Sequence, residues 1–269
     1  NDTGAQMSVF QRSIWARYLQ ALGQDVPFPD DGYGGAYMVD LARDIAMHEG
    51  DRFTKEPVAD NQKALAELGM QTLLANIRAD LASLGVEYDE WYSERSLYAD
   101  GTYEQAMALL QQGGHVAERE GALWFASTAL GEDKDNVLVR TTGIPTYFAS
   151  DAAYHYNKFI VRKFDRVIDL WGADHQGHVS RVKAAVTAVG GNGDDLDVLL
   201  YQLVTLKRGN EVVPLSKRAG EIVTTGSWAG SPVVKRGQKA SAWGHYVLTG
   251  FQDGWAKTAP SSVRPIRAF

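Results

Sequence analysis

The stretch DRVIDLWGADHQGHVSRVKAA (residues 165–185) has the order of elements that decides the fold. Its first part is a short apolar run of the length of a buried strand. Its last part has apolar residues at the spacing of a helix. A glycine and several polar residues separate the two. A strand, a turn and a helix in this order are typical of a parallel sheet with helices packed on its faces.

The same alternation continues on both sides of this stretch. We expect parallel strands near residues 137–141, 165–171 and 198–206, with a helix from about Tyr147 to Phe159 between the first two. Earlier in the chain we expect a long helix over residues 57–84, a small strand near 86–92 and a short helix over 102–112. The sequence therefore predicts an α/β protein, in which ligands bind beyond the carboxyl ends of the parallel strands.

Composition excludes some classes of function. The chain has 269 residues, a formal net charge of −6 and no cysteine, which excludes disulfides and thiolate metal sites. We find no signal segment and no apolar run long enough to cross a bilayer. An acidic chain argues against a general nucleic-acid coat. Residues 226–269 differ, because they hold six Lys or Arg and one acidic residue.

A first candidate site follows the strand expected at 137–141, in TTGIPTYFASDAAYH. Tyr147, Asp151 and either Tyr154 or His155 are spaced to share one face of a helix. A carboxylate beside aromatic hydroxyls suits a guanidinium, which donates two parallel hydrogen bonds to a carboxylate and stacks on rings. The alternative is that Asp151 only places a favourable charge at the start of the helix.

A second candidate site is WGADHQGH (residues 171–178), after the central strand. Gly172 would let the backbone turn sharply and approach a ligand, and Asp174 could accept a hydrogen bond from a ribose hydroxyl. His175 and His178 with Asp174 allow a metal site, but no further group of ligands is visible. The remaining alternative is a turn in which Asp174 or His175 lies near a helix cap.

A third candidate site is VVPLSKRAG (residues 212–220). Ser216, Lys217 and Arg218 follow an apolar run, and adjacent cations on a loop could neutralise a polyphosphate. A polar turn after a strand is the plainer interpretation. The chain contains neither a Walker-type loop nor a G-x-G-x-x-G motif, so the commonest nucleotide-binding folds are excluded.

These motifs together resemble arginyl-tRNA synthetase, a class I aminoacyl-tRNA synthetase. The resemblance covers residues 1–224 and rests on the order of NDTGAQ, DGYGGAYMVDLA, WYSERSLY, VLVRTTGIPTYFASDAAYHYNKF, DRVIDLWGADHQGHVSRVKAA and LSKRAG. It implies a class I, Rossmann-like nucleotide-binding sheet. The chain would be a truncated catalytic core at residues 1–225, with a mostly helical connecting insertion at 30–125 and the second half of the nucleotide-binding fold at 126–225.

The resemblance also implies a reaction and its residues. Arginine would be activated with ATP and transferred to tRNA(Arg), with Mg²⁺ accompanying ATP, in a monomeric enzyme of the cytoplasm. Tyr147, Asp151 and His175 match arginine-binding positions, and Gly172 and Asp174 match the class pattern at the adenosine ribose. Ser216 and Lys217 match the mobile second signature loop, at the pyrophosphate end of ATP. Lys217 would thus both bind ATP and, with Ser216, take part in catalysis.

The chain also departs from the family pattern. Pro214 stands where the second signature begins with lysine, and the His-x-Gly-His signature and the anticodon-binding domain are absent. We expect residues 226–269 to be irregular and to mark a sequence discontinuity, with a basic RNA-contacting tail as the alternative. The fragment could therefore be an inactive synthetase core or a non-catalytic arginine- or tRNA-binding relic. A different nucleotidyl-transfer enzyme is a third possibility.

Overall fold

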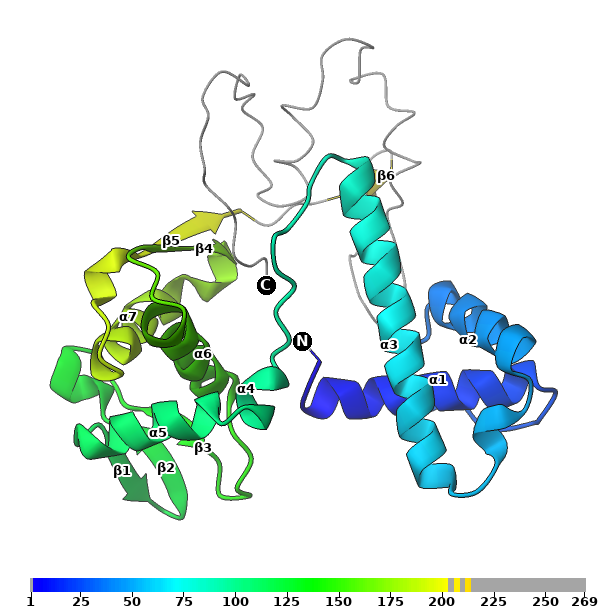
Figure 1. Cartoon of the computed structure of the whole chain (residues 1–269), viewed down its shortest axis with the longest axis horizontal. Helices are drawn as coiled ribbons and strands as arrows, with labels where there is room; N and C mark the ends of the chain where they lie inside the picture. The colour runs from blue at the N-terminus through cyan, green and yellow to red at the C-terminus, as the bar shows by residue number, and fades with distance from the viewer. Residues whose placement is uncertain (1, 203–205, 209–210, 214–269) are drawn as a thin grey trace, which may run out of the picture.

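The computed structural model describes residues 2–202, 206–208 and 211–213. Two lobes are visible in Figure 1, joined by a connector at residues 85–95. The N-terminal lobe is helical and contains α1 (Ala5–Ala21), α2 (Ala36–Glu49), the 3₁₀ turn η1 (Arg52–Thr54) and the long α3 (Val58–Ser83). The C-terminal lobe contains the remaining helices and the sheets.

The C-terminal lobe contains both helices and strands. They are α4 (Ser96–Ala99), α5 (Thr102–Gln112), β1 (Val116–Arg119), β2 (Ala122–Phe125), η2 (Ser127–Leu130), β3 (Asn136–Val139), α6 (Tyr147–Tyr156), η3 (Asn157–Val161), β4 (Val167–Gly172), η4 (Ala173–His178), α7 (Val179–Ala188), η5 (Gly193–Asp195) and β5 (Leu196–Tyr201). Two short strands follow, β6 (Leu206–Arg208) and β7 (Glu211–Val213), which pair antiparallel.

The strand-turn-helix stretch forms the βαβ unit that its sequence predicts. β4 and β5 pair in parallel, in a register that runs from Val167 opposite Leu196 to Gly172 opposite Tyr201. The helix α7 crosses between them and buries Val182, Ala185 and Val186. The predicted α/β class, with a parallel pair and a helix-rich remainder, is confirmed.

Two strand predictions are wrong. β3 does not join the parallel pair; it lies antiparallel to β2, in the three-stranded sheet β1-β2-β3. The reason is a hairpin that the sequence reading missed. Glu120 and Gly121 both have positive φ (52° and 75°), as a two-residue hairpin turn requires, so β1 and β2 pair locally and offer β3 an edge.

The second error concerns residues 86–92, which contain no strand. The aromatic residues that suggested one pack on each other and on the end of α3. The rings of Tyr88 and Trp91 meet edge to face at 5.4 Å, and the Arg78 guanidinium lies 4.8 Å from the Trp91 ring centre. The segment is part of the connector.

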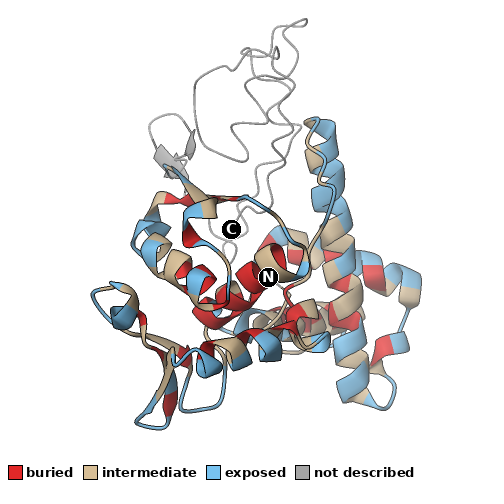
Figure 2. Ribbon diagram, turned by 60° about the vertical axis from the view of Figure 1, so that its left-hand side comes forward, coloured by how far each residue is buried: buried red, intermediate tan, exposed pale blue. Residues whose placement is uncertain are grey.

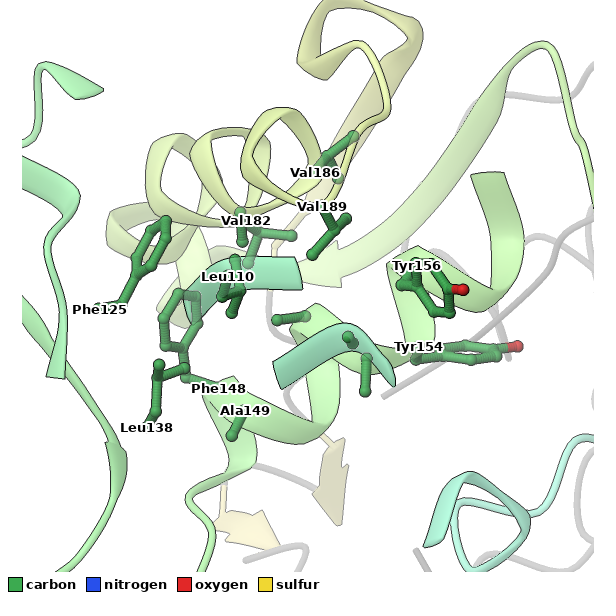
Figure 3. Close-up of a cluster of buried hydrophobic side chains, with 14 of the residues drawn as sticks. Leu110, Phe125, Leu138, Phe148, Ala149, Tyr154, Tyr156, Val182, Val186 and Val189 are labelled. Atoms are coloured by element: carbon green, nitrogen blue, oxygen red, sulfur yellow. The ribbon is translucent and has the colours of Figure 1, made fainter. Parts of the chain in front are cut away.

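Each lobe has its own hydrophobic core, and Figure 2 shows buried residues on the inward faces of the helices in both. Ile14, Tyr18, Met38 and Leu65 are fully buried in the N-terminal lobe. The core of the C-terminal lobe lies between α5, α6, α7 and the strands. Figure 3 shows its labelled side chains converging, among them Phe125, Phe148 and Val182. This second core supports the candidate site.

Candidate functional site

The helix α6 carries the first candidate pair, and its start is well defined. Thr146 is the N-cap: its side chain accepts a hydrogen bond from the Ala149 amide at 3.4 Å. The same hydroxyl donates to the Val137 carbonyl at 2.7 Å, which ties the helix start to β3. Tyr147 is the first helical residue, and the face opposite to it is buried along most of the helix.

Tyr147 and Asp151 lie one turn apart on α6, as the spacing predicted. The Tyr147 side chain is 55% exposed, whereas Asp151 is half-buried. No acidic residue lies in the first turn of α6, and Thr146 already caps the helix. The interpretation of Asp151 as a helix-start charge is therefore weakened, because that benefit falls off within the first turn.

Sequence reasoning missed a cation, Arg181, that the charge of Asp151 influences. Burial lowers the pKa of the Arg181 guanidinium, and the negative charges of Asp151 and Glu132 oppose that shift. Arg181 donates to the Asn136 side chain at 2.9 Å, and its guanidinium lies 5.3 Å from the Phe148 ring centre. The Arg181 guanidinium is thus bound to an amide and lies over a ring, within the electrostatic influence of Asp151. The HVSRVKAA pattern indicated a helix but gave no sign of this placement.

The second candidate stretch forms the end of β4 and the 3₁₀ turn η4. Gly172 is buried and ends the strand, while Asp174 and His175 are exposed. Gly172 has φ −63° and ψ 149°, an extended conformation open to any residue. The expectation that Gly172 permits a sharp turn is therefore wrong, since the backbone bends in the following 3₁₀ turn.

Three aromatic rings line this turn. His175 lies 6.4 Å from the Trp171 ring and 5.5 Å from the His178 ring, and its Nε2 is 3.6 Å from an Asp174 carboxylate oxygen. The pKa of His178 is lowered by burial and by the nearby charges of Arg181 and His175. Neither Asp174 nor His175 caps a helix with its side chain.

Arg181 connects the two candidate groups. Its pKa is influenced by the charge of Asp151, and its own charge lowers the pKa of His178. The packing of α6 against α7 therefore brings the first pair and the second stretch into one neighbourhood. Over residues 2–202, 206–208 and 211–213, no group of three or more possible metal ligands occurs, and no helix is long and apolar enough to cross a membrane. Ser216 and Lys217 lie outside the described residues.

Comparison with known proteins gives one consistent result, although no protein-family model matches the chain. An arginine–tRNA ligase of Dehalococcoides mccartyi is 56% identical over 224 residues, and one of Carboxydothermus hydrogenoformans is 49% identical over the same length. Both alignments cover 83% of this chain and 40% of the relative. The chain thus spans about two-fifths of the length of these curated relatives.

Solved structures agree with these relatives. A crystal structure from Campylobacter jejuni, described as an arginyl-tRNA synthetase, matches with a TM-score of 0.73 and 31% identity. The match covers 85% of this chain and 49% of that one. The arginyl-tRNA synthetase of Thermus thermophilus matches with a TM-score of 0.52 at 20% identity, which supports the fold alone. The chain is therefore homologous to part of the arginyl-tRNA synthetases, and the resemblance found in the sequence is confirmed.

Proposed function

We propose that this chain carries the arginine-binding part of an arginine–tRNA ligase and takes part in the ATP-dependent activation of arginine. In that reaction an arginine carboxylate oxygen attacks the α-phosphorus of ATP. The bond to the bridging oxygen breaks, and pyrophosphate leaves with the electron pair, giving arginyl-adenylate. A ribose hydroxyl of the terminal adenosine of tRNA(Arg) then takes the arginyl group and releases AMP.

The observation that carries the proposal is the placement of Asp151. It is a half-buried carboxylate beyond the first turn of α6, and its charge acts on the guanidinium of Arg181. Asp151 would accept two hydrogen bonds from the substrate guanidinium, and the exposed ring of Tyr147 would cover it. His175 would make a polar contact with the substrate from η4.

The ATP roles follow from the second and third motifs. The backbone at Gly172 and the carboxylate of Asp174 would bind the adenosine ribose at the end of β4. Lys217, with Ser216 beside it, would compensate the charge that builds on the departing pyrophosphate. Mg²⁺ would enter on the ATP phosphates as part of the substrate. Residues 30–125 as a connecting insertion and 126–225 as half of the nucleotide-binding fold remain part of this proposal.

Calorimetry and pyrophosphate exchange test the proposal. Arginine should bind to the purified chain, whereas lysine, which offers a point charge in place of a planar fork, should bind at least about tenfold more weakly. Absence of arginine binding would contradict the proposal. Exchange of pyrophosphate into ATP, measured with arginine and with and without tRNA, separates an active core from a relic that only binds. A relic is worth considering because the match covers only part of each relative.

Exchange with a different amino acid would instead favour another nucleotidyl-transfer enzyme.

A further inference from the structure

Three ionisable side chains are buried inside the C-terminal lobe, and the proposed reaction uses none of them. His155, Lys158 and Asp169 each have side chains that are 0% exposed. Lys158 Nζ lies 2.6 Å from Asp169 Oδ1, and His155 Nε2 lies 2.9 Å from Asp169 Oδ2. Burying charges is costly unless they are paired with good geometry, so such a cluster calls for a reason.

The cluster joins the two parts of the candidate site. Asp169 lies on β4, three residues before Gly172, while His155 and Lys158 lie on α6 and the π turn η3 that follows it. The other ring nitrogen of His155 contacts the backbone one helical turn earlier in α6. This nitrogen, Nδ1, lies 2.7 Å from the carbonyl oxygen of Asp151. One imidazole therefore links the backbone of Asp151 to the strand that leads to the nucleotide motif.

The protonation state of His155 follows from its two partners. The Asp151 carbonyl oxygen can only accept a hydrogen bond. Burial disfavours the ionised form of Asp169, but the positive charge of Lys158 and the hydrogen bond from His155 outweigh it, so the pKa of Asp169 is held below its usual range. The ionised carboxylate is also only an acceptor. Both ring nitrogens thus face acceptors, and both bonds form only when each nitrogen carries a proton.

We propose that Asp169, acting through a doubly protonated His155, is a positioning residue that fixes Asp151 relative to β4. The proposal rests on the function given above, because it assigns Asp151 to arginine. Lys158, on the π turn that follows α6, donates to the same carboxylate. The arginine-binding helix and the nucleotide-binding strand are in this way held to one buried group, and their spacing is set before either substrate arrives.

The chain contains an internal control for this inference. His48 in α2 also lies four residues after an aspartate, and its Nδ1 is also 2.7 Å from that residue's carbonyl oxygen, in Asp44. His48 is exposed, however, whereas His155 is buried. Nε2 of His155 contacts the buried carboxylate of Asp169, and no such contact is seen for Nε2 of His48 among the described residues. The two histidines share the contact between Nδ1 and the carbonyl oxygen four residues earlier. They differ at Nε2, where His155 contacts Asp169, and we attribute the second proton of His155 to that carboxylate.

Nuclear magnetic resonance of the whole chain with ¹⁵N-labelled histidine tests the protonation. The resonances of His48 and His155 are identified among those of the six histidines with the variants His48→Gln and His155→Gln. At neutral pH we expect both ring nitrogens of His155 to show bound protons, and the spectrum of His48, whose Nδ1 has the same kind of contact, gives the comparison. If His155→Gln fails to fold, Asp169→Asn identifies the same resonances. A neutral ring at His155 would overturn the proposal, whether or not arginine binds.

Arginine titration tests the positioning role. Adding arginine should move the Nδ1 resonance of His155 and leave that of His48 in place. Asp169→Asn should lower arginine affinity by about tenfold or more and remove the imidazolium signature, while Asp44→Asn should change neither. A folded Asp169→Asn with normal arginine affinity would contradict the role.

If that variant unfolds, an unmoved His155 resonance in the arginine-saturated parent chain contradicts the positioning role instead. If the parent chain binds no arginine, the proposed function fails and the positioning role fails with it, while the ring signature still decides the protonation.

Discussion

Tyr147 and Asp151 lie one turn apart at the start of α6, and the tyrosine is exposed whereas the aspartate is half-buried. An aromatic ring and a carboxylate one helical turn apart suit a substrate with a cationic, planar end.

Removal of the Asp151 charge should abolish most arginine binding. Asp151→Asn keeps the shape but offers one acceptor and one donor group to a guanidinium, which only donates. We expect calorimetry to show at least about a tenfold loss of affinity, the scale of one charge-assisted hydrogen bond. Asp44→Asn, a change at the corresponding place in α2, should have no effect. Equal affinities for the parent chain and Asp151→Asn would show that Asp151 does not bind the substrate.

Asp169 should make the chain sensitive to acid. Its pKa is lowered in the folded state, so the unfolded chain binds the proton more readily. The stabilisation is present above the unfolded value of about 4 and is lost as the pH falls below it. Urea unfolding between pH 7 and pH 3 should show this loss, and Asp169→Asn should show a smaller one.

At pH 7 the same variant should be less stable by about 3–5 kcal/mol, because the buried Lys158 loses its counter-ion and His155 loses a charged acceptor. A stability profile that is unchanged by the substitution would mean that the cluster is not charged in the folded protein.

Tyr103 should make the chain sensitive to alkali. Burial, together with the neighbouring Tyr98 and Glu104, raises the pKa of Tyr103 to about 12. The unfolded chain therefore loses the phenolic proton first, and stability should fall as the pH rises from about 10 towards 12. Tyr103→Phe should flatten this part of the urea-unfolding profile. Tyr147→Phe, at an exposed tyrosine, serves as the control, and equal slopes in the two variants would contradict the expectation.

Gly69 should resist substitution despite its place in the long helix α3. Alanine favours a helix by about 1 kcal/mol over glycine, but a Cβ at Gly69 would overlap Cδ1 of Ile14, which is fully buried in α1. Overpacking of this kind costs about 1–3 kcal/mol, so we expect Gly69→Ala to be neutral or destabilising in chemical denaturation. Gly177→Ala adds a methyl group in open space and is the control. A gain in stability from Gly69→Ala would show that the two helices separate easily.

The sequence predicted those parts of the fold in which a local pattern and the tertiary packing agree. The apolar spacing of residues 57–84 identified α3, and the apolar run before Gly172 identified β4. It failed where pairing depended on a partner elsewhere. The strand at 137–141 was correctly placed, but its neighbour was decided by a tight turn at Glu120 and Gly121, whose positive φ values the composition did not reveal.

The candidate site was predicted in part for the same reason. Helical spacing placed Tyr147 and Asp151 on one turn, because that relation is local. The approach of Arg181 and the enclosure of His155 depend on how α6 packs against α7 and β4. One signal was available in the sequence: Asp169 interrupts an otherwise apolar strand, and an acid at such a position requires a buried partner.

The two separate cores have a consequence for how the chain melts. Every buried member of one hydrophobic cluster comes from residues 10–66, and every buried member of the other from residues 97–196. Polar contacts join the connector to the N-terminal lobe, such as Arg95 with Glu67 at 2.9 Å. The chain should therefore unfold on heating in two cooperative steps. The van 't Hoff enthalpy from a two-state fit would then be smaller than the calorimetric enthalpy. Gly69→Ala would then move one step and leave the other at its temperature.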